Sequence, residues 1–218
     1  MTREFNLSTA RDRRAAYAHY VWNDHAYFRL AYLNAHWISD EMVRAAQPWP
    51  FQFKAWRDRG IRTIVNLRGG RDSHHMLEDA ACRRYGLKQV NYVVASRDVP
   101  SREQILGARA LFEGLEYPAL MHCKSGADRA GLAAGLAILF EGGSAAQALA
   151  QLSWRFGHFS RSRTGILDAF FLHYAAVAEG RVPFLLWVER EYDEADLRRR
   201  FVASGISSFI VDRVLQRE

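Results

Sequence analysis

The chain has 218 residues, of which 49% are apolar, 25% are charged and only 5 are proline. This length and composition predict one folded domain with a sizeable core and helical appendages, and they exclude a disordered or low-complexity chain. The formal net charge of +6 favours anionic partners. No arginine-rich arm or zinc-finger spacing accompanies that charge, so we expect no nucleic-acid partner.

The start of the chain and its cysteines bear on the compartment. The stretch MTREFNLSTARDRR has no apolar run that could serve as a secretion signal, and no window reaches the roughly 18 apolar residues that a membrane span needs. We therefore expect a cytoplasmic protein. Its two cysteines, Cys82 and Cys123, cannot form a disulfide framework, so each is a candidate reactive thiol.

Residues 12–38 combine many aromatic side chains with interleaved charges, which predicts one or two amphipathic helices. Such helices can pack against the domain or lie on a membrane surface. Asp24, His25 and Arg29 interrupt the aromatic face, which favours packing over membrane contact. We assign residues 1–39 to an N-terminal helical segment.

The next part of the chain alternates between strand and helix patterns. Apolar or β-branched runs predict strands at residues 42–47, 61–67, 88–94 and 117–123. Helices are predicted at residues 51–60, closed by Gly60, at 77–86, closed by Gly86, at 101–115, opened by a Ser101/Gln104 capping box, and at 128–143. This alternation predicts an α/β fold with a central, mainly parallel twisted sheet flanked by helices.

After residue 144 the pattern is helical only, with predicted helices at 144–157, 165–180 and 193–218. No linker separates them from the preceding residues. We therefore expect an α/β domain at residues 40–180 followed by a C-terminal helical extension at 181–218.

The stretch MHCKSGADRAG, residues 121–131, joins the last predicted strand to a helix. In open α/β sheets, ligands bind at the carboxyl ends of the strands, where this loop is expected. Gly126 permits a tight turn whose backbone N–H groups, with the helix N-terminus, form a nest for an oxyanion. Arg129 supplies a bidentate donor to that anion, and this environment favours a Cys123 thiolate placed for in-line attack on phosphorus.

The sequence HCKSGADR resembles the His-Cys-x5-Arg signature of the cysteine-dependent protein tyrosine phosphatases, and most of all the small dual-specificity type of bacteria. The similarity extends upstream through AAQP and GIRTIVNLRGG and covers roughly residues 40–160. It implies the protein tyrosine phosphatase-like fold and a phosphomonoester hydrolase with a phosphocysteine intermediate. A phosphorylated protein or small phosphorylated molecule is the implied substrate, and the resemblance implies no metal or cofactor.

The resemblance also implies roles for the motif residues. Cys123 is the expected nucleophile, and His122 is expected to fix the loop by hydrogen bonding rather than by proton transfer. The expected phosphate-binding residues are Lys124, Ser125, Gly126, Ala127, Asp128 and Arg129.

The general acid is open between two aspartates. The family takes it from a loop upstream of the cysteine, where ASRDVPS places Asp98, although Asp98 could also be an ordinary loop residue near the Ser101 helix cap. Asp128, inside the phosphate loop, is the rival, but a carboxylate beside a bound dianion must turn outward, pair with a cation or stay protonated. We rank Asp98 first.

Two positions affect which reaction is expected. The family usually has Ser or Thr after the arginine, and this chain has Ala130, so phosphocysteine could form normally and hydrolyse slowly. A catalytically weak phosphate-binding module is therefore one alternative. Lys124 resembles the loop of lipid- and inositol-directed relatives, which makes a phosphoinositide or inositol phosphate substrate a second alternative.

Two further features allow two interpretations each, and a pair of histidines allows one. Cys82 is either a small core residue or a redox partner that forms a disulfide with Cys123, as in some relatives. FGHFSRSRTG, residues 156–165, is either a basic pocket rim or a solvated turn, and the turn is favoured. His74 and His75 are adjacent and so poorly placed to share a metal, and no ligand cluster indicates zinc.

Overall fold

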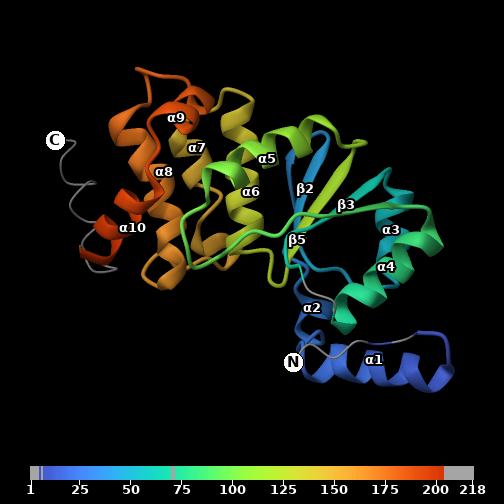
Figure 1. The fold of residues 1–218 in the computed structure, drawn as a ribbon. Coiled ribbons are helices and arrows are strands. Elements are labelled where there is room, and N and C mark those ends of the chain that lie inside the picture. The colour runs from blue at the N-terminus through green and yellow to red at the C-terminus, as the bar shows by residue number, and fades with distance from the viewer. Residues whose placement is uncertain (1–4, 6, 70–71, 204–218) are drawn as a thin grey trace. The chain divides into compact units, whose positions relative to one another are not determined.

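A computed structural model of the chain describes residues 5, 7–69 and 72–203 (Figure 1). The chain divides into two compact units. The first unit comprises residues 1–93 and 115–126 and contains the sheet, and the second comprises residues 94–114 and 127–218 and is helical where it is described.

The first unit is built on a five-stranded sheet in the order β1-β2-β5-β3-β4. Its strands are β1 (His36–Ser39), β2 (Met42–Ala46), β3 (Thr63–Asn66), β4 (Lys88–Asn91) and β5 (Ala119–Cys123). All pairings are parallel except that of β1 with β2. The parallel strands are the four predicted from the sequence, so the predicted α/β class with a mainly parallel sheet is confirmed.

Strand β1 corrects the prediction that residues 12–38 are helical throughout. Helices α1 (Ala10–Trp22) and α2 (Phe28–Ala31) lie within that range, but the chain then turns at Asn34, whose φ of 48° is outside the helical region. Residues 36–39 add an antiparallel edge strand to β2. Four residues are too few for the alternation of burial in a strand to stand out from an aromatic-rich helical pattern.

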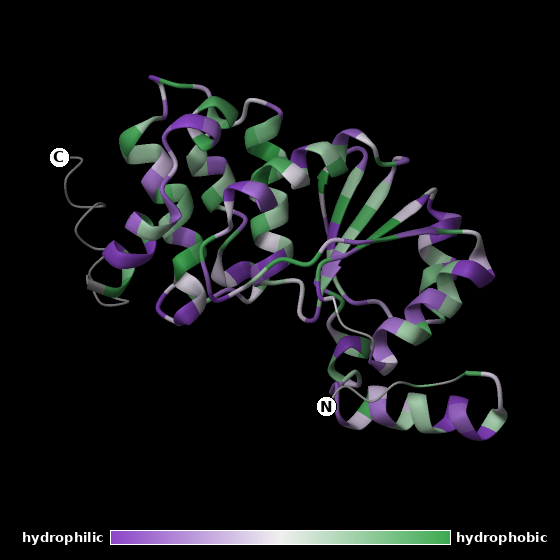
Figure 2. Cartoon of the chain, viewed as in Figure 1, coloured by the Kyte–Doolittle hydropathy of each residue, from purple (hydrophilic) through white to green (hydrophobic). Residues whose placement is uncertain are grey.

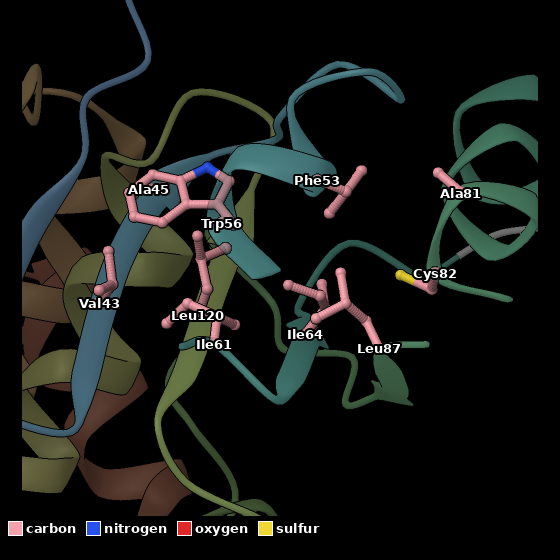
Figure 3. Close-up of a cluster of buried hydrophobic side chains, with 10 residues drawn as sticks. All are labelled: Val43, Ala45, Phe53, Trp56, Ile61, Ile64, Ala81, Cys82, Leu87 and Leu120. Carbon is pink, nitrogen blue, oxygen red and sulfur yellow. The ribbon is translucent and has the colours of Figure 1, made fainter. Parts of the chain in front are cut away.

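Two helices of the first unit pack on the sheet, α3 (Phe53–Asp58) and α4 (Ser73–Tyr85). Their apolar side chains join those of the strands in one buried cluster (Figure 3). The cluster consists of Val43, Ala45, Phe53, Trp56, Ile61, Ile64, Ala81, Cys82, Leu87 and Leu120. Gly86 ends α4 with a left-handed φ of 68°, as its position in the sequence predicts.

The N-terminal helix α1 packs along α4 (Figure 1). Its Tyr20 is buried and contacts the Trp49 ring edge-on, with centroids 5.2 Å apart. Trp22 and Phe28 are 70% and 67% exposed. No helix among the described residues is long and apolar enough to cross a membrane. The preference for packing over contact with a membrane surface stays a prediction.

The second unit consists of helices. They are α5 (Arg102–Glu113), α6 (Asp128–Phe140), α7 (Ala145–Leu149), the short 3-10 helices η1 (Trp154–Phe156) and η2 (Arg163–Gly165), α8 (Ile166–Val177), α9 (Phe184–Arg190) and α10 (Glu194–Ala203). Figure 2 shows α6 and α8 as largely apolar and α10 as largely polar. The predicted Ser101/Gln104 capping box opens α5.

Helix α9 is absent from the sequence prediction, and α7 is shorter than predicted for residues 144–157. An aromatic cluster holds α8 and α9 together, because Trp187 lies with its ring centroid 5.9 Å from Phe170 and 5.1 Å from Tyr174. Part of the helix predicted at 193–218 is α10, and the remainder lies outside the described residues.

Candidate active site

The first half of the motif loop belongs to the first unit. Strand β5 lies between β2 and β3 and ends at Cys123, which is 2% exposed. The chain then turns through Lys124, Ser125 and Gly126 before α6 begins at Asp128. The cysteine therefore stands at the carboxyl end of the central strand, the edge of a parallel sheet at which ligands bind.

Two side chains hold the carbonyl groups of this turn. Asn34 Nδ2 donates to the Ser125 carbonyl oxygen at 2.9 Å, and Arg44 Nη2 donates to the Gly126 carbonyl oxygen at 2.7 Å. Arg44 is fully buried in β2. In a trans peptide the N–H points opposite to the carbonyl, so the Gly126 N–H is directed away from Asn34. Such an arrangement prepares the turn to present N–H groups to an anion.

Gly126 cannot be replaced without strain. Its φ is 73°, and a Cβ atom built on it would lie 2.5 Å from the Ala46 nitrogen and 2.7 Å from the Ala45 carbonyl carbon. The turn thus runs directly against the backbone of β2, a close approach that only glycine allows.

We expect Gly126→Ala to lower the free energy of unfolding by about 1–3 kcal/mol or more, because it adds a backbone clash to a left-handed conformation. Gly142→Ala is the matched control. Gly142 has a similar φ of 79°, but a Cβ atom at this residue would have no neighbouring atom within 4 Å, so only the conformational cost applies. Denaturant unfolding of both variants measures the difference. If both variants lost the same free energy of unfolding, the clash of the Gly126→Ala side chain with β2 would be relieved at no cost.

His122, just before the cysteine, is fully buried, and its Nε2 lies 3.0 Å from Glu78 Oε2 on α4. Glu78 also accepts hydrogen bonds from Gln47 at 2.5 Å and from Gln89 at 2.7 Å. Burial by itself raises the pKa of Glu78, but the charge of His122 and these hydrogen bonds outweigh it and lower the pKa. The Glu78 carboxylate thus lies against His122 from α4, and the supporting role of His122 stays a prediction.

Glu78 was missed in the sequence analysis, although its position carries a signal. It lies on the buried face of α4 with Leu77, Ala81 and Cys82. A glutamate on an apolar helical stripe must have a buried partner, because an unpaired buried charge is very costly.

Lys124 belongs to a second charged cluster. Its Nζ lies 3.5 Å from Asp24, which also pairs with Arg29 at 2.6 Å and Arg68 at 2.5 Å. Burial of Asp24 opposes its ionisation, yet hydrogen bonds and charge from Arg68 and Arg29 lower its pKa far below the usual range. Asp24 and Arg29, two of the polar residues that interrupt the aromatic face at residues 12–38, therefore form a buried ion pair. One carboxylate here faces three cations.

Cys82 packs among apolar side chains of the cluster shown in Figure 3, with its sulfur directed from α4 into that cluster. Burial raises its pKa strongly, and the charges of Glu78 and Asp79 add to this effect. Both cysteines are free thiols. This setting supports the core-residue interpretation, and the redox pairing with Cys123 stays a prediction.

The second half of the loop belongs to the second unit. Asp128 begins α6 and contacts His158 Nδ1 at 2.7 Å, while His158 Nε2 contacts Asp168 on α8 at 2.6 Å. Burial lowers the pKa of His158, but the hydrogen bonds and charges of the two aspartates outweigh it and raise the pKa to about 9. The expectation of a solvated turn at 156–165 is therefore wrong for His158, although Arg161 and Arg163 are exposed.

Asp98 lies in the second unit, in the loop before α5. Its Oδ1 accepts from Arg198 of α10 at 2.8 Å and from the Val99 backbone N–H at 2.9 Å. The Arg198 hydrogen bond is the main cause of a lowered pKa for Asp98. Asp98, Arg97, Arg163 and Arg198 line a cavity of about 350 Å³.

The same loop is tied to the C-terminal segment at further points. Tyr192 Oη donates to the Pro100 carbonyl at 2.9 Å, and Arg102 donates from its backbone to Glu194 at 2.7 Å and from its side chain to the Tyr192 carbonyl at 2.8 Å. The position of the expected acid thus depends on residues about a hundred positions away in the chain.

Burial and the charge of Arg68 lower the pKa of His74 to about 4, and its Nε2 lies 3.2 Å from the Gly69 carbonyl oxygen. Within residues 5, 7–69 and 72–203, no three histidine, cysteine, aspartate or glutamate side chains gather in a way that could hold a metal ion.

No protein-family model and no curated protein matches this sequence. Solved structures do match. TpbA from P. aeruginosa has a TM-score of 0.53 and 21% identity, over 78% of this chain and 91% of TpbA. A cysteine-to-serine variant of TpbA in complex with phosphotyrosine gives the same TM-score at 20% identity. A protein from Shewanella putrefaciens CN-32, classed as a phosphatase, has a TM-score of 0.51 and 19% identity, over 68% of this chain and 94% of its own. The chain therefore has the fold of the cysteine-dependent protein tyrosine and dual-specificity phosphatases.

Proposed function

We propose that the protein is a metal-independent phosphomonoester hydrolase that acts through a phosphocysteine, with a phosphorylated tyrosine, serine or threonine residue as substrate. The observation that carries this proposal is the turn after Cys123, whose carbonyl groups are held by Asn34 and Arg44 at the end of the central parallel strand. The fold shared with phosphatases and the phosphotyrosine bound by the TpbA variant support it.

The reaction has two steps in this proposal. The Cys123 thiolate attacks phosphorus, a sulfur–phosphorus bond forms, and the bond from phosphorus to the leaving oxygen breaks as that oxygen takes a proton from Asp98. Water then attacks the phosphocysteine and gives a proton to the Asp98 carboxylate. The sulfur–phosphorus bond breaks, which releases inorganic phosphate and returns both the thiolate and the protonated acid. Arg129 and the loop N–H groups bind the phosphoryl oxygens in both steps.

Asp98→Asn is expected to lower kcat/KM, which reports the step that releases the phenol, by about 10²–10⁴ for phenyl phosphate, whose leaving group needs a proton. The same variant should lose much less activity toward an aryl phosphate with a strongly acidic phenol, which leaves without help. Because the hydrogen bond from Arg198 lowers the pKa of Asp98, Asp98 must first take up a proton to act as the acid. Steady-state rates across a series of phenols measure this. If Asp128→Asn, and not Asp98→Asn, loses activity mainly on substrates with poor leaving groups, Asp128 is the acid.

Trapping of the phosphoenzyme tests the function as a whole. Acid-quenched wild type exposed to a labelled aryl phosphate should carry label on Cys123, and the Cys123→Ser variant should release no product. Ala130 predicts a burst of phenol followed by slower turnover, since the hydroxyl that usually follows the arginine is missing. A chain that binds phosphate but releases no phenol would be the phosphate-binding module of the alternative interpretation.

The charged cluster around Lys124 favours a second candidate substrate class. Arg29, Arg68 and Lys124 all pair with Asp24, so these four residues together carry a net positive charge beside the loop, which suits a substrate with further phosphate groups. Parallel assays on phosphopeptides and on phosphoinositides or inositol phosphates distinguish the two classes.

A further inference from the structure

His158 is fully buried between two carboxylates. Its side chain is 0% exposed, and its two ring nitrogens contact Asp128 at 2.7 Å and Asp168 at 2.6 Å. Asp168 is 5% exposed and also accepts from the Ser160 hydroxyl at 2.8 Å. A histidine with a carboxylate at each nitrogen donates through both, so the imidazolium is the form that these contacts stabilise.

Asp128 is the member of this cluster that concerns the loop. It immediately precedes Arg129, and its side chain is 28% exposed. A carboxylate at this place would repel a phosphate dianion unless a cation compensated its charge.

We propose that His158 is a positioning residue for the proposed phosphatase reaction: its charge compensates Asp128 and its hydrogen bond holds that carboxylate at a fixed place, so that the loop can accept a phosphate dianion. Asp168, tied to Ser160, keeps the imidazole in place and charged. This inference rests on the proposed function. It also explains why an acidic residue is compatible with an anion-binding loop.

The test measures the affinity for inorganic phosphate, as a competitive inhibitor of aryl phosphate hydrolysis. The first variant is His158→Gln with Asp168→Asn, which removes the buried cation together with its buried partner and so avoids an unpaired charge in the core. Asp128 then lacks its adjacent cation. The loss of the Asp168 charge, on the other side of the imidazole, offsets part of this effect, so the inhibition constant for phosphate should rise by about fivefold, less than for the loss of one whole charge.

Adding Asp128→Asn to this variant should bring the inhibition constant back to within about threefold of the wild type, because the repulsion is removed. A purely structural role for His158 predicts no such recovery, since the third substitution removes another hydrogen-bonding partner. Thermal unfolding of each variant reports whether it is folded.

The outcomes separate the inference from the function on which it rests. Weakened phosphate binding that the Asp128 substitution restores supports the positioning role. Unchanged binding in the first variant, or weakened binding that is not restored, overturns it while leaving the phosphatase proposal intact. A wild type that neither binds phosphate nor hydrolyses an aryl phosphate overturns both.

Discussion

Arg129→Lys is expected to lower kcat/KM for an aryl phosphate by about 10²–10³, the loss typical of one donor to a transition-state oxyanion. Lysine keeps the positive charge, but it lacks the planar pair of N–H donors that fits two phosphoryl oxygens at once. Steady-state kinetics at several substrate concentrations measure the loss, and a fall in kcat as well as a rise in KM would show that the contact strengthens in the transition state.

The exposed Arg190 on α9 offers a matched control, since Arg190→Lys makes the same chemical change away from the motif. This control should retain wild-type kinetics. If Arg129→Lys also kept more than a third of wild-type kcat/KM, bidentate binding of phosphate by Arg129 would be excluded.

Glu78→Ala is expected to lower the free energy of unfolding by about 3–5 kcal/mol, because it leaves His122 buried without the carboxylate that lies 3.0 Å from its Nε2. Gln47 and Gln89 would each lose an acceptor as well. Glu78→Gln is the better-tolerated comparison, since it keeps the size of the side chain and one acceptor oxygen. Urea unfolding at neutral pH measures both losses.

The effect of Glu78 depends on pH in a defined direction. Its pKa in the folded protein is below the ordinary 4.5, so the ionised form favours folding. This contribution is fully present above pH 4.5 and is lost as the pH falls through the lower folded-state pKa. The gap in stability between wild type and Glu78→Gln should therefore be constant near neutral pH and narrow in acid. A gap that widens as the pH falls would contradict the lowered pKa.

Local sequence was enough to predict those features that short-range physics controls. The capping box at Ser101, the left-handed Gly86 and the parallel strands each depend on residues within one element or on the alternation of elements. The motif at residues 122–129 belongs to the same class, because its spacing alone specifies a cysteine, a tight turn and an arginine between a strand and a helix.

Only the tertiary structure identified the side chains that support the motif. Glu78 reaches His122 from a helix 44 positions earlier, and Asp168 reaches Asp128 through His158. Arg198 pairs with Asp98 across a hundred positions. Ion pairs and hydrogen bonds of this kind connect elements that are distant in the chain, so a single sequence can mark a residue such as Glu78 as buried but cannot identify its partner. The motif is set by local sequence, whereas the charges around it are set by packing.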